Sequence, residues 1–282
     1  MAGRLCRNGA RPEHGDGGVA RAVLRKVPPM KDDPVFLLGT PSDACPQILA
    51  TGRTDVTTIY TSLSRRHPDG LDADYLEWHS LDHRPEQHRL AQLRASFRMV
   101  STPECRATRA ASDERYNAAD HLQSYFFTSL SAMDGFQDLN SALHEAGRSP
   151  YSLPLVERGV YRVDGIAAAP RIKIGADVLL WWAAKGVYFM IERGGGSVAD
   201  LLDVPGVGGA WWGEAVPLEP PFNTRDNSGL HVSYLFLDDE PANVAKRLRA
   251  RLEERWSNAG NEPLLAAPFH SLVAYEWDRY LP

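Results

Sequence analysis

The feature that most constrains the fold is an order of expected strands and helices that occurs twice along the chain. From residue 57, apolar periodicity predicts strand, helix, strand, strand, helix and strand, and the same order recurs from residue 187. The first half is expected to contain strand 57–63, helix 73–83, strand 106–112, strand 121–128, helix 133–146 and strand 160–166. The second half is expected to contain strand 187–192, helix 198–202, strand 210–212, strand 230–237, helix 241–256 and strand 269–276. One order used twice predicts two units of the same kind in tandem.

A β-α-β-β-α-β order is typical of a ferredoxin-like unit, in which two helices cover one face of a four-stranded antiparallel sheet. The other face of such a sheet needs a partner. The sequence therefore predicts an α+β protein of two tandem ferredoxin-like repeats, with antiparallel sheets packed face to face as an intrachain α/β barrel. A cavity between the two sheets is the expected ligand site.

A constant offset of 109 residues relates the last three expected elements of the two halves. At this offset Tyr125 falls on Tyr234 and Val160 falls on Phe269. These matches indicate a duplication. They also predict that Tyr125 and Tyr234 face one enclosed space from opposite halves.

Composition divides the chain into four expected parts. Residues 1–34 are expected to form a disordered tail, because their first 29 residues are rich in Gly, Arg and Pro and lack any sustained period. Residues 35–166 form the first repeat with the expected site, residues 167–185 a linker, and residues 186–282 the second repeat.

Charge and cysteine usage exclude several classes of function. The net charge of -5 is spread along the chain without a long basic run, which argues against nucleic acid as a partner. The 3 cysteines form no CxxC pair, so neither a disulfide framework nor a zinc site is expected. No segment has the length and apolarity of a membrane helix or of a signal peptide. We therefore expect a cytoplasmic protein whose partner is a small hydrophobic or aromatic molecule, and a homodimer through an edge strand stays open.

One stretch resembles a known superfamily. Residues 75–86, YLEWHSLDHRPE, resemble the first-helix signature of the dimeric α/β barrel superfamily and are most similar to EthD-like proteins. Residues 204–207, VPGV, look like the Pro-Gly turn before the second strand of the same superfamily. The superfamily includes polyketide cyclases, muconolactone isomerases, cofactor-free monooxygenases and haem-binding proteins. The resemblance therefore implies a cavity more firmly than a chemistry, and implies a single site because the second half has no counterpart of His83.

His83 is the candidate catalytic residue, because an imidazole with an ordinary pKa near ~6.5 takes or gives a proton near neutral pH. Asp82 is the candidate partner that orients the ring, with Glu86 as a further one. The alternative is a histidine favoured in a last helical turn by the helix dipole. His79 lies four residues before His83 and shares its helix face, but a third metal ligand is lacking and no metal is predicted.

Several aromatic and polar side chains are candidates for contact with an aromatic or polycyclic ligand. Strand 121–128 carries His121, Gln123 and Tyr125 on one face, and this face is expected to line the cavity because its polar groups would be unpaired against helices. Packing in the core is the alternative for each aromatic side chain. The candidate ligand contacts are Tyr75, Trp78, His79, His121, Tyr125, Trp211 and Tyr234.

Two functions and one inert alternative follow from the sequence. The first is an enzyme that acts by proton transfer without a cofactor, as an isomerase or cyclase or in cofactor-free oxidation of an oxygenated aromatic substrate. The second is a non-catalytic protein that binds a ligand or haem, with His83, His231 or His270 on the iron. In the third, the two sheets pack dry with no cavity between them.

Overall fold

The computed structural model describes residues 36–38 and 54–281, and its strands pair into one sheet that closes on itself. The first half contains β2 (Thr58–Ser64), α1 (Asp72–Trp78), the π-helical turn η1 (His79–His83), α2 (Arg84–Gln87), β3 (Leu93–Val100), β5 (His121–Phe127), α4 (Ala132–Glu145) and β6 (Leu155–Ala168). The second half contains β7 (Gly186–Arg193), η4 (Ala199–Leu201), β8 (Val207–Ala215), β9 (Leu230–Leu237), α5 (Pro241–Ala259) and β10 (Glu262–Ser271). Shorter elements are β1 (Phe36–Leu38), α3 (Pro103–Ala107), β4 (Ala111–Ser112), η2 (Tyr116–Ala118) and η3 (Ala176–Trp181).

The two halves share one strand order. The sheet runs β6-β2-β5-β3 through the first half and β10-β7-β9-β8 through the second. In each half, the strands therefore follow one another across the sheet in the order fourth, first, third, second. Antiparallel pairs β3–β10 and β6–β8 join the halves and close the ring. The prediction of an α+β fold with antiparallel strands in an α/β barrel is confirmed. The edge strands that were expected to offer a route to self-association pair within the chain.

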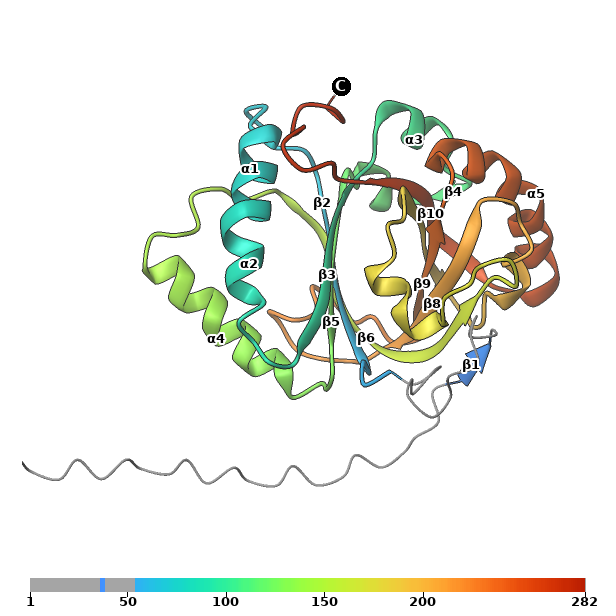
Figure 1. The fold of residues 1–282 in the computed structure, drawn as a ribbon, viewed down its shortest axis with the longest axis horizontal. Helices are drawn as coiled ribbons and strands as arrows, with labels where there is room; N and C mark the ends of the chain where they lie inside the picture. Colours follow the sequence, from blue (N-terminus) through green and yellow to red (C-terminus); the bar gives the residue numbers. More distant parts are fainter. Residues whose placement is uncertain (1–35, 39–53, 282) are drawn as a thin grey trace, which may run out of the picture. The chain divides into compact units, whose positions relative to one another are not determined.

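The α-helices lie outside the barrel (Figure 1), whereas side chains of the short helix η3 belong to the core inside it. Helices α1, α2 and α4 cover the outer face of the first-half strands, and α5 covers strands of the second half. Helix α5 begins with Pro241 in its first turn and ends at Gly260, whose φ of 67° suits a left-handed cap. Its apolar side chains Leu248 and Leu252 pack in a second core between the helix and the sheet.

The interior of the barrel is packed with apolar side chains, which corrects the prediction of a cavity between the sheets. Trp211, Phe126, Phe189 and Tyr234 are fully buried in one cluster there. The ring centroids of Phe126 and Trp211 lie 5.8 Å apart, and those of Phe189 and Tyr234 lie 4.9 Å apart. Trp211 donates its indole N–H to the carbonyl of Ala176 in η3, over 2.9 Å. The expected linker 167–185 thus contributes to this core.

The two faces of β5 are the reverse of the prediction. Leu122 and Phe126 point into the barrel core, and the Ser124 hydroxyl lies 2.8 Å from the Tyr234 hydroxyl there. Tyr125 and Phe127 pack with α4 on the outer, helix-covered face. The reason is that helices α1 and α2 bring polar side chains that pair with the polar face of β5, so its burial against helices leaves few groups unsatisfied.

The offset of 109 residues does not relate equivalent positions. Tyr125 and Val160 lie in the core under the first-half helices, whereas Tyr234 and Phe269 lie inside the barrel. Equivalent residues of two like strands must lie on the same face of their sheets, because side chains alternate along a strand. The two halves therefore share a strand order, but these residue matches do not support a duplication.

The second strand of the first half is β3, not the expected strand 106–112. Thr102 caps helix α3 by accepting a hydrogen bond from the Cys105 N–H over 3.1 Å, and Pro103 occupies the first turn. A short helix and the two-residue β4 therefore occupy the segment predicted as a strand. The last strand, β10, also begins seven residues before the expected one.

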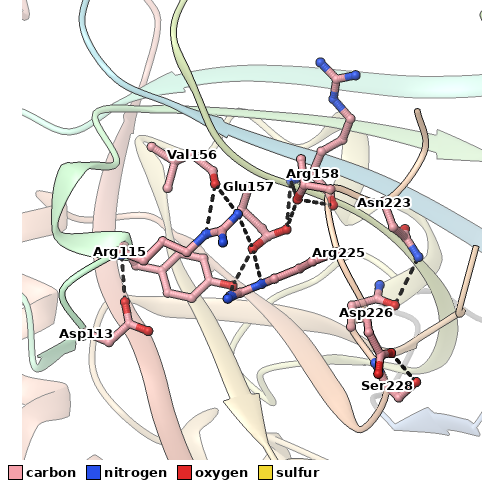
Figure 2. Close-up of polar contacts among 12 residues, drawn as sticks. Asp113, Arg115, Val156, Glu157, Arg158, Asn223, Arg225, Asp226 and Ser228 are labelled. Atoms are coloured by element: carbon pink, nitrogen blue, oxygen red, sulfur yellow. Dashed lines mark hydrogen bonds and ion pairs between the residues drawn. The ribbon is translucent and has the colours of Figure 1, made fainter. Parts of the chain in front are cut away.

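A buried carboxylate fixes the loop between β8 and β9 to the barrel (Figure 2). Glu157 on β6 lies 3.2 Å from the guanidinium of Arg115 and 3.0 Å from that of Arg225. The Tyr116 hydroxyl donates to the same carboxylate over 3.2 Å, and the Thr224 hydroxyl donates to its other oxygen. The cluster joins residues of both halves, so it stabilises the junction beside the first-half sheet.

Some predictions fall on residues that the structure does not describe. The expected tail, residues 1–34, and the cysteines Cys6 and Cys45 lie outside the described residues. Cys105 is buried with a free thiol. In the described part of the chain, no helix combines the length and the apolarity needed to cross a membrane.

Candidate functional site

A pocket of about 650 Å³ lies between the first-half helices and the outer face of the first-half strands. Helical residues Tyr75, Trp78, His79 and His83 line it together with Tyr125 of β5. Five of the residues predicted to bind or transform a ligand therefore meet in one space. That space lies under the helices and not between the sheets, which places the site on the opposite face of the sheet from the predicted cavity.

A π-helical turn brings His79 and His83 to this pocket. Pro85 has no N–H, so the ordinary helical bond to the carbonyl four residues earlier is missing at this point. The preceding N–H, of Arg84, bonds to the carbonyl of His79, five residues earlier, and the helix widens. The two imidazole centroids lie 5.7 Å apart, and the His83 ring lies 4.8 Å from that of Trp78. The prediction that both histidines share one face is confirmed, and such turns are common at functional sites.

Arg98 of β3 sets the direction of the hydrogen bonds behind the pocket. A guanidinium only donates, so Gln123 must accept from Arg98 through its Oε1 atom. The Gln123 amide nitrogen then donates to Nε2 of His79 over 2.5 Å. His79 consequently carries its proton on Nδ1, a buried atom without a partner. The lone pair of His79 accepts from Gln123, so the His79 ring helps to position the Gln123 amide.

A second chain of hydrogen bonds ends at His83. The Tyr125 hydroxyl donates to Oε1 of Gln87 over 2.5 Å, so the Gln87 amide nitrogen is a donor. That nitrogen lies 3.0 Å from Nε2 of His83 and 2.8 Å from Oδ1 of Asn140. The Nε2 atom of His83 is therefore the acceptor. If a ligand takes the place of Gln87 at His83, the Gln87 amide nitrogen still donates to Asn140.

Burial keeps His79, His83 and Tyr125 of the pocket neutral. Desolvation, followed by the positive charge of Arg98, lowers the pKa of His83 to about 4. The same two causes lower the pKa of the buried His79 well below its ordinary value. Burial raises the pKa of Tyr125, which stays a phenol. At neutral pH, His83 is an unprotonated imidazole that has the charge state of a base.

Asp82 does not orient His83, contrary to the prediction. Its carboxylate pairs with Arg148 over 2.8 Å, and Glu86 pairs with the same guanidinium over 3.0 Å. The indole N–H of Trp78 donates to the carbonyl of Arg148 over 3.1 Å. These contacts tie the helix to the segment after α4 and fix one wall of the pocket. Gln87, and not an acidic residue, contacts His83.

Three predicted ligand contacts lie away from the pocket lining. His121 is buried 2.7 Å from the carboxylate of Asp72, beneath the helix α1. Trp211 and Tyr234 belong to the barrel interior. His121 does not line the pocket because Asp72 on α1 pairs with it, and Trp211 and Tyr234 do not line it because they lie on the inner face of the sheet.

Sequence reasoning missed Gln87, Asn140, Arg98 and Arg158. Gln87 lies on α2 and Asn140 on α4, and amide side chains are common at exposed positions of helices. Nothing in the sequence therefore distinguishes these two residues as part of a site. Arg98 had a signal, since it lies in a strand between Phe97 and Met99 and is 4% exposed. A charged residue so deeply buried is rare and calls for a reason.

Comparisons with known proteins stand beside this geometry. No protein-family model and no curated protein matches the chain. Solved structures do resemble it. An anthrone oxidase-like protein is 9% identical with a TM-score of 0.44, over 79% of this chain and 94% of its own. The protein named "Putative Chlorite dismutase TA0507" is 10% identical with a TM-score of 0.48, over 80% and 99%. A "Putative monooxygenase" of Fusobacterium nucleatum is 10% identical with a TM-score of 0.37, over 77% and 92%.

At these identities and TM-scores the likeness carries no argument about chemistry. The fold rests on the strand order of the chain itself, and the resemblance to EthD-like proteins stays a prediction. The site is therefore interpreted from its own residues.

Of His79 and His83, only His83 offers a nitrogen, Nε2, to a ligand in the pocket. The Nε2 atom of His79 accepts from Gln123, and the Nδ1 atoms of both histidines are buried. By contrast, Nε2 of His83 accepts from Gln87, which keeps Asn140 as a partner if a ligand takes its place. His231 and His270 lie on β9 and β10, outside the pocket lining. Within residues 54–281, no group of three His, Cys, Asp or Glu side chains is placed to hold a metal ion.

Proposed function

We propose that the first-half pocket binds an oxygenated aromatic or polycyclic molecule and moves a proton on it, as an isomerase or cyclase does. The observation that carries this proposal is the convergence of a neutral His83, four tyrosines and a tryptophan on one pocket of about 650 Å³. That volume suits a ligand of two or three fused rings.

His83 acts as the base in this proposal. A C–H bond next to a carbonyl group of the ligand gives its proton to Nε2 of His83, and the electron pair moves onto the carbonyl oxygen as an enolate. The Tyr75 hydroxyl supports that oxygen, because its own oxygen already accepts from Arg98 over 2.5 Å and its proton is free to donate. Return of the proton at another carbon completes an isomerisation.

The second half argues for a single site. The equivalent space under α5 holds an apolar core of Tyr188, Met190, Leu235 and Leu248, and the short η4 stands where the first half has a long helix. We infer that the two halves derive from one duplicated unit of which only the first kept a pocket, which is supported by the common strand order.

Replacing His83 by alanine is expected to abolish the proton transfer. The probe is 2-tetralone in D₂O, whose acidic C–H positions next to the carbonyl exchange with deuterium when a base removes their protons. NMR measures the exchange rate with the full chain, and we expect His83→Ala to lower the enzyme-dependent rate about 100-fold or more. His88→Ala is the matched control, because His88 is an exposed histidine directly after α2 and outside the pocket lining.

Two outcomes contradict the proposal. Equal exchange rates for His83→Ala and the parent chain would remove His83 as the base. Binding of 2-tetralone without any enzyme-dependent exchange would favour the non-catalytic binding protein instead.

The pH dependence of the exchange separates a base from an acid. Since the pKa of His83 is about 4, the neutral ring forms as the pH rises through that value. We therefore expect kcat/KM to rise through about pH 4 and to stay level between about pH 6 and 8. A rate that falls as the pH rises through 4 would mean that the protonated ring acts as an acid.

A further inference from the structure

Arg98 is a buried cation without a carboxylate. Its side chain lies on β3 behind the pocket and is 4% exposed. The guanidinium donates to the Tyr75 hydroxyl and to Gln123, and it lies 4.9 Å from the centre of the Tyr75 ring. Its Nε atom has no partner, and none of the ion pairs among the described residues includes Arg98. Buried charges of this kind are normally paired.

Among the described residues, no carboxylate pairs directly with Arg98. Tyr75 and Gln123, its two partners, are neutral acceptors, and His79 beyond them is a neutral imidazole. Asp72, the buried carboxylate of α1, is bound to His121 and accepts the N–H of His67 over 3.1 Å. The positive charge of Arg98 therefore acts on the pocket through the Tyr75 hydroxyl and the Gln123 amide, both of which line it.

Arg158 supplies a second positive charge at the wall of the pocket. Its neighbour Glu157 is taken by Arg115 and Arg225, and Figure 2 shows the Arg158 guanidinium pointing away from that carboxylate. The guanidinium reaches only a carbonyl, that of Pro221, over 3.3 Å, and its Nε atom has no partner. The one carboxylate that lines the pocket, Glu145, is exposed at the rim.

We infer that the ligand of this pocket is an organic anion whose negative charge offsets part of the positive charge of Arg98 and Arg158. The inference rests on the proposed function and narrows its ligand class to aromatic carboxylates and phenolates. The second N–H of the Gln123 amide donates to the anion, and Arg98 strengthens that bond by donating to Oε1 of the same amide, so the Tyr75 proton stays available for the carbonyl oxygen. The aromatic rings of Trp78 and Tyr125 flank the apolar part of the ligand.

The test compares an acid with its neutral amide. Binding of 2-naphthoate and of 2-naphthamide to the full chain is measured by calorimetry, since the two probes share size and rings and differ in charge. We expect the acid to bind at least about tenfold more tightly than the amide. Arg98→Met should reduce that ratio to about one by weakening the acid alone. Arg94→Met is the matched control, because Arg94 lies on the same strand but is half exposed and paired with Asp55.

Each outcome has one meaning. Equal binding of acid and amide to the parent chain overturns the anion inference and leaves the proposed pocket intact. Binding of neither probe overturns both. Should Arg98→Met fail to fold, Arg158→Met removes the second charge at the pocket wall and must also lower the ratio, while an unchanged ratio in that variant overturns the role of the two guanidinium groups.

Discussion

Replacing Glu157 by glutamine is expected to lower the free energy of unfolding by about 3 kcal/mol. The Glu157 side chain is 5% exposed and neutralises two guanidinium groups, those of Arg115 and Arg225. Glutamine keeps the shape but removes the charge, so both cations stay at the junction without a counter-charge. Because Arg115 and Arg225 are 36% and 40% exposed, water offsets part of the loss, and the value lies at the low end for a broken buried pair. Urea denaturation measures the change.

Glu214→Gln is the matched control for this prediction. Glu214 also lies on a barrel strand and pairs with an arginine, Arg162, over 3.1 Å, but its side chain is 44% exposed. We expect a change below about 1 kcal/mol there, because exposed pairs contribute little. Equal losses in the two variants would contradict the claim that Glu157 holds the junction of the two halves.

The architecture was predictable because it depends on the order of the elements. Apolar periodicity located ten of the twelve expected strands and helices near their observed places, and the repeated order determined which sheet faces needed cover. The closing pairs β3–β10 and β6–β8 follow from two open sheets within one chain. The local signals of α3, Thr102 followed by Pro103, are present in the sequence, but the apolar pattern of residues 106–112 predicts a strand there.

The location of the pocket was not predictable from periodicity. Alternation along β5 separates a polar from an apolar face without saying which one meets the helices. The polar face turned to the helices because Gln87, His79 and Asp72 are there to pair with it. This pairing between helix and sheet depends on the tertiary structure, since the partners are separated by between 38 and 49 residues in the chain. The histidines His79 and His83 were found because both sit on one helix, where spacing alone fixes the shared face.

Replacing Trp211 by alanine is expected to lower the free energy of unfolding by about 3 to 5 kcal/mol. The Trp211 side chain is fully buried in the barrel core, packs edge to face on Phe126 at 5.8 Å and donates to the carbonyl of Ala176. Alanine leaves a hole in the centre of the barrel, where neighbouring strands from both halves prevent collapse. Thermal and urea denaturation measure the loss. Trp181→Ala is the matched control, because Trp181 is 58% exposed and its removal should change stability by less than about 1 kcal/mol.

A second substitution at Trp211 separates the barrel interior from the pocket as the ligand site. If the interior is a packed core, Trp211→Phe, which is the milder substitution, will lower stability while leaving the affinity for 2-naphthoate unchanged. Trp78→Phe should weaken the affinity for 2-naphthoate and leave the stability unchanged, because Trp78 lines the pocket and contacts His83. A weaker affinity in Trp211→Phe with unchanged stability would mean that the ligand enters between the two sheets, where the sequence alone had placed it.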